Sequence, residues 1–460
     1  MIGRGTGRPR VSRGWARAPA WHAVAVAAFV LAVVHAPGLA NAAIVRPAPM
    51  RPHASLLSSD PSPGASVVAP LARIRLQFNE PVESALTGVA VVTAAGDTLA
   101  LSPVADPYDV HAVLAQAPAL RPGPYTITWH VVSADGHRVD GSFGFILAPT
   151  GTAATPSRQA EGLPAAKPPD ADTGSWSSPL GNTRFARALG KRPAVPILRS
   201  LAITALLSLA GLTLLIATLP ISGPRPMRLA LVLAVLSTGL LAAYSVVWSA
   251  TAVGDGRGLA ESVSLTASTT PGALEVARVA LAFLALWALA LARRSGLAAM
   301  FSGVAVLITG ASGHPAVTSP LISIPAKSIH LAAAALWLGG LMWIVTAERH
   351  GARYVEGTRR ISSLAFVSVI VVVATGIVQA LLFLPHFSAL TGSVYGQIIL
   401  AKTAGLLVLV IFGAFHRRVV PRLDTTMARR RLRGSVRLEI VVMIAVAILG
   451  GLLAAISPTR

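Results

Sequence analysis

The stretch SADGHRVDGSFGF at residues 133–145 is polar and strand-like, whereas most of the chain consists of long apolar runs. Alternate residues of an extended segment point to the same side, so Asp135 and His137 present a carboxylate and an imidazole together, and Gly136 permits a tight turn between them. These two groups form half of a metal site. A short Asp-Gly turn is also common in hairpins that bind nothing, so the spacing alone leaves both interpretations open.

Residues 53–149 around this stretch have the pattern of short β-strands. Residues 73–78 alternate polar and apolar side chains, and residues 88–93 and 125–132 are rich in Val, Ile, Thr, Tyr and Trp. Turns that contain glycine or proline separate these runs. The pattern predicts a small all-β sandwich or barrel.

The segments that flank the β region differ from it in composition. Five arginines precede an apolar run at residues 23–34 and an Ala-Asn-Ala pattern at 40–42, which is typical of an export signal over residues 1–43; an uncleaved anchor helix is the alternative. Residues 44–52 are then a short extension, and residues 150–195, rich in Ala, Pro, Gly and Ser, are a flexible linker. On either interpretation we expect the β region to lie outside the cytoplasm.

Residues 196–460 have the composition of a membrane domain. Only 12% of the whole chain is charged, against roughly 25% in soluble domains. Eight apolar runs approach the length of about 20 residues that crosses a bilayer, and the fourth is the shortest. They lie at about residues 197–221, 229–253, 272–292, 297–313, 321–346, 361–385, 394–415 and 437–457. The chain is therefore expected to be a multi-domain membrane protein, with an all-β N-terminal domain and an all-α bundle of about eight transmembrane helices.

The net charge of +21 comes largely from the loops between these runs. Arginines gather in alternate loops, which is how membrane orientation is encoded, and this argues for a lipid bilayer as the partner and against nucleic acid. The cationic loops hold Arg225 and Arg228; Arg293 and Arg294; Arg349, Arg353, Arg359 and Arg360; and the cluster at residues 417–433. With these loops in the cytoplasm and an even number of spans, the β domain and the C-terminus lie on the periplasmic or extracellular side of the inner or plasma membrane.

Histidines are the most promising metal ligands, because the chain contains no cysteine. In the hairpin, a third ligand such as His53 would favour copper over calcium or magnesium. In the membrane, His330 lies about nine residues, or roughly 13 Å, inside the fifth span. His314 and His386 are expected at outer ends of spans, and the three form a possible transport path. Each is also compatible with a structural or interfacial role.

Other ionisable side chains in the spans are given structural roles. Lys327 and Lys402 are expected to snorkel or to pair with Glu275. Glu439 and Arg437 are expected to anchor the inner end of the last span at the membrane interface.

The β region resembles the CopC family of periplasmic copper-binding domains. The motifs that carry the resemblance are HASL at residues 53–56, SSDP at 58–61, LQFNEPV at 76–82, WHVVSADGH at 129–137 and GSF at 141–143. The resemblance implies a Greek-key β-barrel and a Cu(II) site formed by His53, Asp135 and His137. In the family the N-terminal histidine also binds through its amine, but about ten residues would precede His53 here. No Met occurs at residues 53–149, so a Met-rich Cu(I) site is not expected.

The membrane part resembles the CopD family, which often follows CopC in one chain. The matching stretches are GHP at residues 313–315, HLAAAALWLGGL at 330–341, LAK at 400–402 and RLE at 437–439. The resemblance implies a CopC–CopD fusion that acts in copper uptake and copper tolerance.

Three functions are compatible with these observations. In the favoured one the β domain captures Cu(II) outside the cytoplasm and the bundle passes copper inward, as a transporter and not an enzyme, with no ATP-binding motif to supply energy. The alternatives are a periplasmic copper buffer or sensor without transport, and a haem-bearing membrane reductase. The last is the weakest, because a haem needs facing histidines at similar depth.

Overall fold

The computed structural model describes the β domain and the membrane helices, and Pro49–Arg460 form one compact unit. The described residues are 54–133, 136–150, 194–219, 224–253, 257–313, 320–348, 352–384 and 388–454. The predicted signal peptide at residues 1–43, the extension at 44–52 and residues 151–193 of the predicted linker lie outside them. These segments stay predictions.

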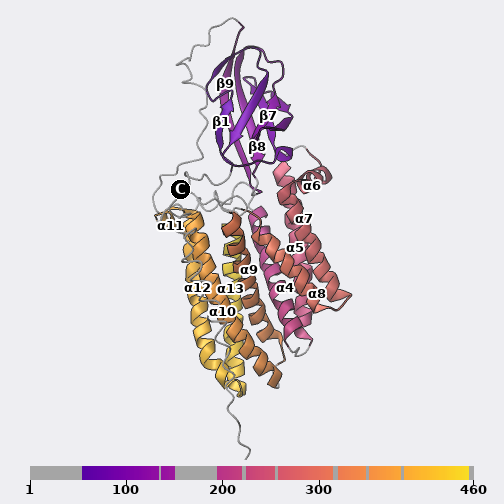
Figure 1. Ribbon diagram of the computed structural model, residues 1–460, viewed down its shortest axis with the longest axis vertical. Helices are drawn as coiled ribbons and strands as arrows, with labels where there is room; N and C mark the ends of the chain where they lie inside the picture. The colour runs from indigo at the N-terminus through magenta and orange to yellow at the C-terminus, as the bar shows by residue number, and fades with distance from the viewer. Residues whose placement is uncertain are drawn as a thin grey trace, which may run out of the picture. The chain divides into compact units, whose positions relative to one another are not determined.

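The β domain consists of two sheets (Figure 1). One has the strand order β1-β3-β7-β6 and the other the order β2-β9-β8-β4-β5. The strands are β1 (Leu56–Asp60), β2 (Ser66–Val68), β3 (Arg73–Phe78), β4 (Gly88–Thr93), β5 (Thr98–Leu101), β6 (Pro103–Asp106), β7 (Asp109–Gln116), β8 (Gly123–Val132) and β9 (Arg138–Ala148), with a 3-10 turn η1 at Ser84–Leu86. Strands β3, β4 and β8 confirm the three strands predicted from alternation and composition.

The core of this domain follows from the alternation along β3. Ile74, Leu76 and Phe78 are buried, while the residues between them are not, so one face of the strand packs inward. Phe78 meets Trp129 of β8 edge to face, with ring centroids 5.2 Å apart. Phe143 of β9 joins the same cluster, so residues from both sheets form one hydrophobic core.

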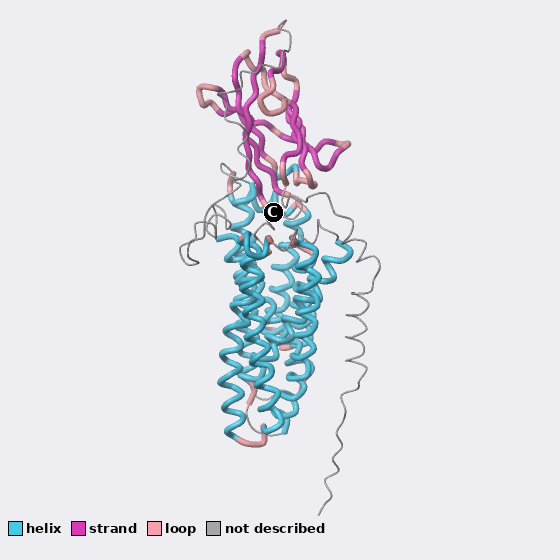
Figure 2. The backbone as a smooth tube through the Cα atoms, turned by 90° about the vertical axis from the view of Figure 1, so that its left-hand side faces the viewer, coloured by secondary structure: helices cyan, strands magenta, loops and turns pink. Residues whose placement is uncertain are grey.

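The membrane part is a bundle of long helices that run side by side (Figure 2). Its elements are α4 (Ala194–Thr218), α5 (Arg225–Val253), α6 (Leu259–Ala267), α7 (Thr270–Ala290), α8 (Ser295–Gly310), α9 (Pro320–Thr346), α10 (Ala352–Phe383), α11 (Ala389–Gly392), α12 (Val394–Val419), η3 (Val420–Arg422) and α13 (Thr426–Leu453). Every predicted span contains a helix. Among the described residues seven helices are long and apolar enough to cross a membrane.

The exception is α8, the span that the sequence marks as shortest. Its 16 residues extend about 24 Å, less than the roughly 30 Å of a hydrocarbon core. It packs against α4, α7 and α9.

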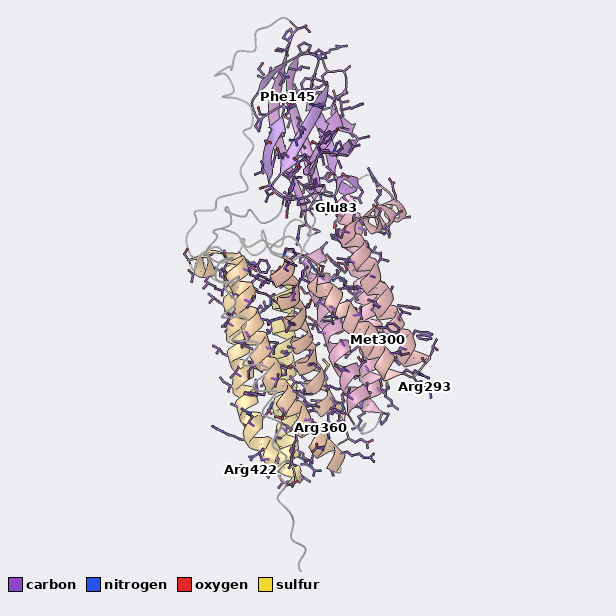
Figure 3. All side chains as sticks on the ribbon, in the orientation of Figure 1. Glu83, Phe145, Arg293, Met300, Arg360 and Arg422 are labelled. Atoms are coloured by element: carbon purple, nitrogen blue, oxygen red, sulfur yellow. The ribbon has the colours of Figure 1, made fainter. Side chains whose placement is uncertain are left out.

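Two helices begin well before their apolar runs. Helix α10 starts at Ala352 and α13 at Thr426, about ten residues earlier than predicted from hydropathy. The added turns are rich in arginine, and arginine favours the helix as strongly as most apolar residues do. Hydropathy locates the apolar part of a helix, and the helix itself can begin several residues earlier. Figure 3 shows Arg293, Arg360 and Arg422 toward the same end of the bundle, as their assignment to one side of the membrane requires.

Helix α4 is the central helix of the bundle, with 72% of its most apolar window buried. It crosses α9 at a pair of glycines. A Cβ on Gly211 would collide with the carbonyl oxygen of Ala335, and one on Gly339 would collide with the backbone of Gly211. The glycines of the WLGG segment thus permit a close approach of the two helices.

We expect Gly339→Ala to destabilise the folded protein by about 2 kcal/mol or more, because the added methyl group must push two backbones apart. The measurement is the melting temperature of the purified protein in detergent. The control is Gly239→Ala in α5, where no described atom lies within 4 Å of the added Cβ. Equal melting temperatures for the two variants would contradict the close crossing.

Candidate functional site

The predicted copper hairpin joins β8 to β9 by a short turn. The last pair of the ladder is Val132 with Arg138. Beyond it, Ser133 donates from its backbone amide (2.9 Å) and its hydroxyl (3.1 Å) to the carbonyl oxygen of His137. Gly136 has a φ of 86°, a conformation that favours glycine, as the sequence predicted. These bonds fix the backbone position of His137 at the start of β9.

Only part of the predicted ligand set falls on described residues. His137 is described and partly buried, whereas His53 and Asp135 lie outside the described residues. Within the described part of the chain no three His, Asp or Glu side chains are close enough to hold a metal ion together. The set His53, Asp135 and His137 therefore stays a prediction.

The NEPV segment at residues 79–82 contacts the chain at Ser55, two residues after His53, and at Ser133, two residues before Asp135. The side chain of Asn79 accepts from the amide of Ser55 at 2.5 Å, and the amide of Asn79 donates to the carbonyl of Ser55 at 3.1 Å. Three residues later, Val82 forms a bridge with Ser133. The NEPV motif thus holds the residues that follow His53 and the residue that begins the hairpin turn.

The hairpin is also bonded to the end of α5. The indole nitrogen of Trp248 donates to the carbonyl oxygen of Gly136 at 3.0 Å, and the guanidinium of Arg138 donates to the carbonyl oxygen of Thr251 at 3.1 Å. Leu86 and Val132 of the β domain form one buried apolar cluster with Trp248 and its neighbours on α5. The hairpin turn therefore rests directly on a membrane helix.

Two ionisable groups of the β domain are perturbed where it meets the helices. Burial raises the pKa of the Glu83 carboxyl, against the opposing effect of a hydrogen bond from the Thr270 backbone. Burial lowers the pKa of His130, which interacts with the backbone of Val253. Both groups favour their neutral forms, as groups removed from water do.

Inside the bundle, His330 has one ring nitrogen committed to Thr375 of α10. The Nδ1 atom lies 3.0 Å from the Thr375 hydroxyl, whose single proton is donated to the carbonyl oxygen of Val371 at 2.6 Å. With that proton engaged, the hydroxyl can accept from His330, and in the neutral tautomer that donates from Nδ1 the Nε2 atom keeps its lone pair. Gly376 of α10 lies next to the ring, and a Cβ added to it would make van der Waals contact with Cε1 at 3.8 Å. An imidazole oriented in this way is ready to bind a metal.

A second polar group lies deeper along α9. Trp337 donates from its indole nitrogen to Glu439 of α13 at 3.1 Å. The other carboxylate oxygen of Glu439 is 3.1 Å from Nδ1 of His416, and Nε2 of His416 is 2.7 Å from the hydroxyl of Ser435. Glu439 is only 1% exposed. The expectation that Glu439 anchors the membrane interface is wrong, because its carboxylate is enclosed by partners from α9 and α12.

The expected pairing of Lys327 with Glu275 is also wrong. Glu275 pairs with Arg278 on its own helix, and Lys327 donates to the carbonyl oxygen of Ser312 at 2.7 Å. His314 and His386 lie outside the described residues, so their place on a path stays a prediction. His416 was missed because it stands next to Arg417 at the end of its apolar run, where a histidine looks like one more cation of the loop. The only available signal was the RLE motif, which holds its partner Glu439.

Comparison with known families follows the same division of the chain. The CopC domain family matches residues 56–148, and the Copper resistance protein D family matches residues 356–453. The chain is a CopC–CopD fusion. The match to CopD covers α10, α12 and α13, which carry Thr375, His416 and Glu439, whereas His330 and Trp337 on α9 precede it.

Individual relatives cover the fusion to different extents. Copper transport protein CutJ of Bacillus subtilis is 23% identical over 425 residues, which are 86% of this chain and 73% of CutJ. Protein YobA of Escherichia coli K12 is 33% identical over 95 residues, 20% of this chain and 77% of YobA. The crystal structure of CopC from Methylosinus trichosporium OB3b shares 26% identity, with a TM-score of 0.21, over 22% of this chain and 98% of that protein.

We expect Glu439→Ala to destabilise the bundle by about 2–4 kcal/mol, because it leaves the Trp337 indole and the His416 ring without their buried partner. Thermal or denaturant unfolding in detergent measures the loss. The matched control is Glu356→Ala, which removes an exposed carboxylate paired with Arg360 and should cost less than about 0.5 kcal/mol. If both variants unfold alike, the buried network does not stabilise the bundle.

Proposed function

We propose that the chain imports copper: its CopC domain binds Cu(II) outside the cytoplasm, and its membrane helices pass copper inward. A role in copper resistance or transport follows from the two domains and from the CutJ relative. Direction, oxidation state and the absence of catalysis belong to the proposal. So does the orientation, in which the cationic loops lie in the cytoplasm.

The capture site in this proposal is the hairpin. His137 would supply an imidazole from a backbone position fixed by Ser133, and Asp135 and His53 would complete the set. Two imidazoles and a carboxylate suit Cu(II), which prefers nitrogen and oxygen ligands. The bonds of Asn79 and Val82 near two of these positions support the idea that they belong to one site.

The observation that carries the proposal is the hydrogen bond from Trp248 to the carbonyl oxygen of Gly136. Gly136 stands between two of the predicted ligands, and Trp248 belongs to a membrane helix. Movement of α5 therefore acts directly on the turn that would hold the metal. A buffer domain needs no such attachment to the bundle, whereas a transporter must bring the captured ion to its path.

Within the bundle, the proposed path follows one face of α9. His330 and Trp337 are seven residues apart, which is nearly two turns, so they share a face about 10 Å apart along the axis. The lone pair on His330 Nε2 offers the first ligand. The carboxyl group of Glu439 and the ring of His416 lie deeper on the same route and offer oxygen and nitrogen ligands to a cation.

We expect His137→Ala to lower both Cu(II) affinity, by more than about tenfold, and copper accumulation in cells that lack the native chain. Trp248→Phe keeps the aromatic packing but removes the bond to Gly136, so it should lower accumulation while leaving Cu(II) affinity nearly unchanged. Affinity is measured by titration of the purified protein, and accumulation by elemental analysis of cells with matched expression.

The control for both variants is His111→Ala. His111 lies on β7 with 41% of its side chain exposed, pairs with Asp109 and is not one of the predicted ligands, so accumulation should be that of the wild type. Normal Cu(II) affinity in His137→Ala would show that the hairpin is not the copper-binding site. Normal accumulation in both hairpin variants would leave the domain as a copper buffer.

We expect His330→Leu to insert into the membrane normally, because it keeps the helix apolar, and to reduce copper uptake severalfold. The same change at His386, expected at the outer rim, should reduce uptake far less. Initial rates of radiocopper uptake at equal membrane levels provide the measurement. Wild-type rates in His330→Leu would show that this histidine only packs against Thr375.

A further inference from the structure

The proposed copper path leaves one pocket of the β domain unused. The pocket has a volume of about 730 Å³, which is in the range of small-molecule sites in proteins. It lies on the face of the sheet β2-β9-β8-β4-β5 that points away from the hydrophobic core. The lining comprises residues 84–90, 100–103, 128–130 and 140–142, together with Val253 and Arg257 of the membrane part.

The register of the strands explains why this face is hollow. Alternate residues of β8 point into the core, so Thr128 and His130 point outward. In the row of Thr128, its neighbours across the strands are Ser142 of β9 and Ala90 of β4, and Ala90 is followed by Ala100 of β5. All four side chains in this row are small, so they form a low floor.

Gly88 keeps the ring of His130 at the side of this pocket. The two residues are partners across β4 and β8, and a Cβ on Gly88 would collide with the imidazole. The ring therefore lies against the backbone of β4, where a larger residue would push it over the floor.

The polar groups of the lining are mostly hydroxyls, with one free positive charge. The hydroxyl residues are Ser84, Thr87, Ser102, Thr128 and Ser142. Burial, and then the nearby Arg138, lower the pKa of His130, so its ring is neutral. Asp140 accepts two hydrogen bonds from Arg138, at 3.0 and 2.8 Å. Arg257 has only an exposed pairing with Glu261 at 3.5 Å, which holds it weakly, so its charge is available to a ligand.

We propose that this pocket binds a sugar acid, a small molecule with several hydroxyl groups and one carboxylate. Arg257 binds the carboxylate, because a guanidinium donates charge-assisted hydrogen bonds to it. The hydroxyls of Thr128 and Ser142 and the carboxylate of Asp140 exchange hydrogen bonds with the hydroxyl groups of the ligand. A metal ion suits the pocket less, because its possible ligands His130 and Asp140 lie beside arginines. The proposal goes beyond copper transport and stands without it.

The test is equilibrium dialysis of the purified full-length chain, in detergent and without copper, against radiolabelled gluconate. Gluconate should bind saturably. Sorbitol has the hydroxyl groups without the carboxylate, and acetate has the carboxylate without the hydroxyl groups. Each should compete at least about tenfold less well than unlabelled gluconate, because each lacks one set of hydrogen bonds.

Two variants change the pocket in different ways. Arg257→Gln removes the charge, and Thr128→Leu fills the floor, so each should weaken gluconate binding by at least about tenfold. The matched controls are Arg121→Gln, an exposed cation of the β domain, and Thr126→Leu, on the same strand and the same face as Thr128. Neither control residue belongs to the described lining, so both variants should bind like the wild type. None of the four side chains is buried, so each variant should fold.

Several results would overturn the proposal. One is the absence of saturable gluconate binding by the wild type. Equal competition by sorbitol would show that the carboxylate is not recognised, and equal competition by acetate would show that the hydroxyl groups are not. Wild-type affinity in both Arg257→Gln and Thr128→Leu would place bound gluconate outside this pocket.

Discussion

The close crossing of α4 and α9 is the constraint on which the arrangement of the membrane part depends. Gly339 lies nine residues after His330, or about 180° around the helix, whereas Trp337 lies nearly above His330. The face of α9 that presses its glycine against Gly211 is therefore opposite to the face that carries the two polar side chains. Fixing the first face against the central helix directs the second toward α10 and α13. The spacing of the HLAAAALWLGG motif is explained by this division of one helix into a packing face and a polar face.

The polar face matters because a group in hydrocarbon has no water to bond with. Each of its side chains finds a partner on another helix: His330 meets Thr375 of α10, and Trp337 meets Glu439 of α13. These bonds connect parts of the chain that are about 45 and 100 residues apart. They stabilise the bundle and at the same time orient the groups that a metal ion would use. Replacing one partner therefore affects both stability and function, and the two effects need separate measurements.

Local patterns in the sequence predicted the elements well and their long-range partners poorly. Alternation in residues 73–78 predicted β3, and hydropathy located every membrane helix. Both signals are local, because the residues that bury one strand face or cross the bilayer are close to one another in the sequence. The partners of Glu439 and Lys327 were predicted wrongly, because the spacing of nearby residues does not show which distant segments pack together. The hairpin turn at Gly136 was predicted correctly, but His53 and Asp135 lie outside the described residues, so the copper ligands rest on the family resemblance.

The distribution of buried charge sets a condition on any copper path. Two like charges 4 Å apart repel by about 4 kcal/mol at an effective dielectric constant of 20, so uncompensated cations near the outer ends of the helices would oppose the entry of a metal ion. Of the two buried carboxylates described in the bundle, Glu275 is neutralised by Arg278, and Glu439 has the neutral indole of Trp337 and the ring of His416 as partners. Glu439 thus differs from Glu275 in having no arginine or lysine as a partner among the described residues. The electrostatics favour a metal ion deep in the bundle and disfavour it at the outer ends. A protein that imports copper with this arrangement must lower the outer barrier, and keeping the ion on the hairpin until it reaches His330 is one way to do so.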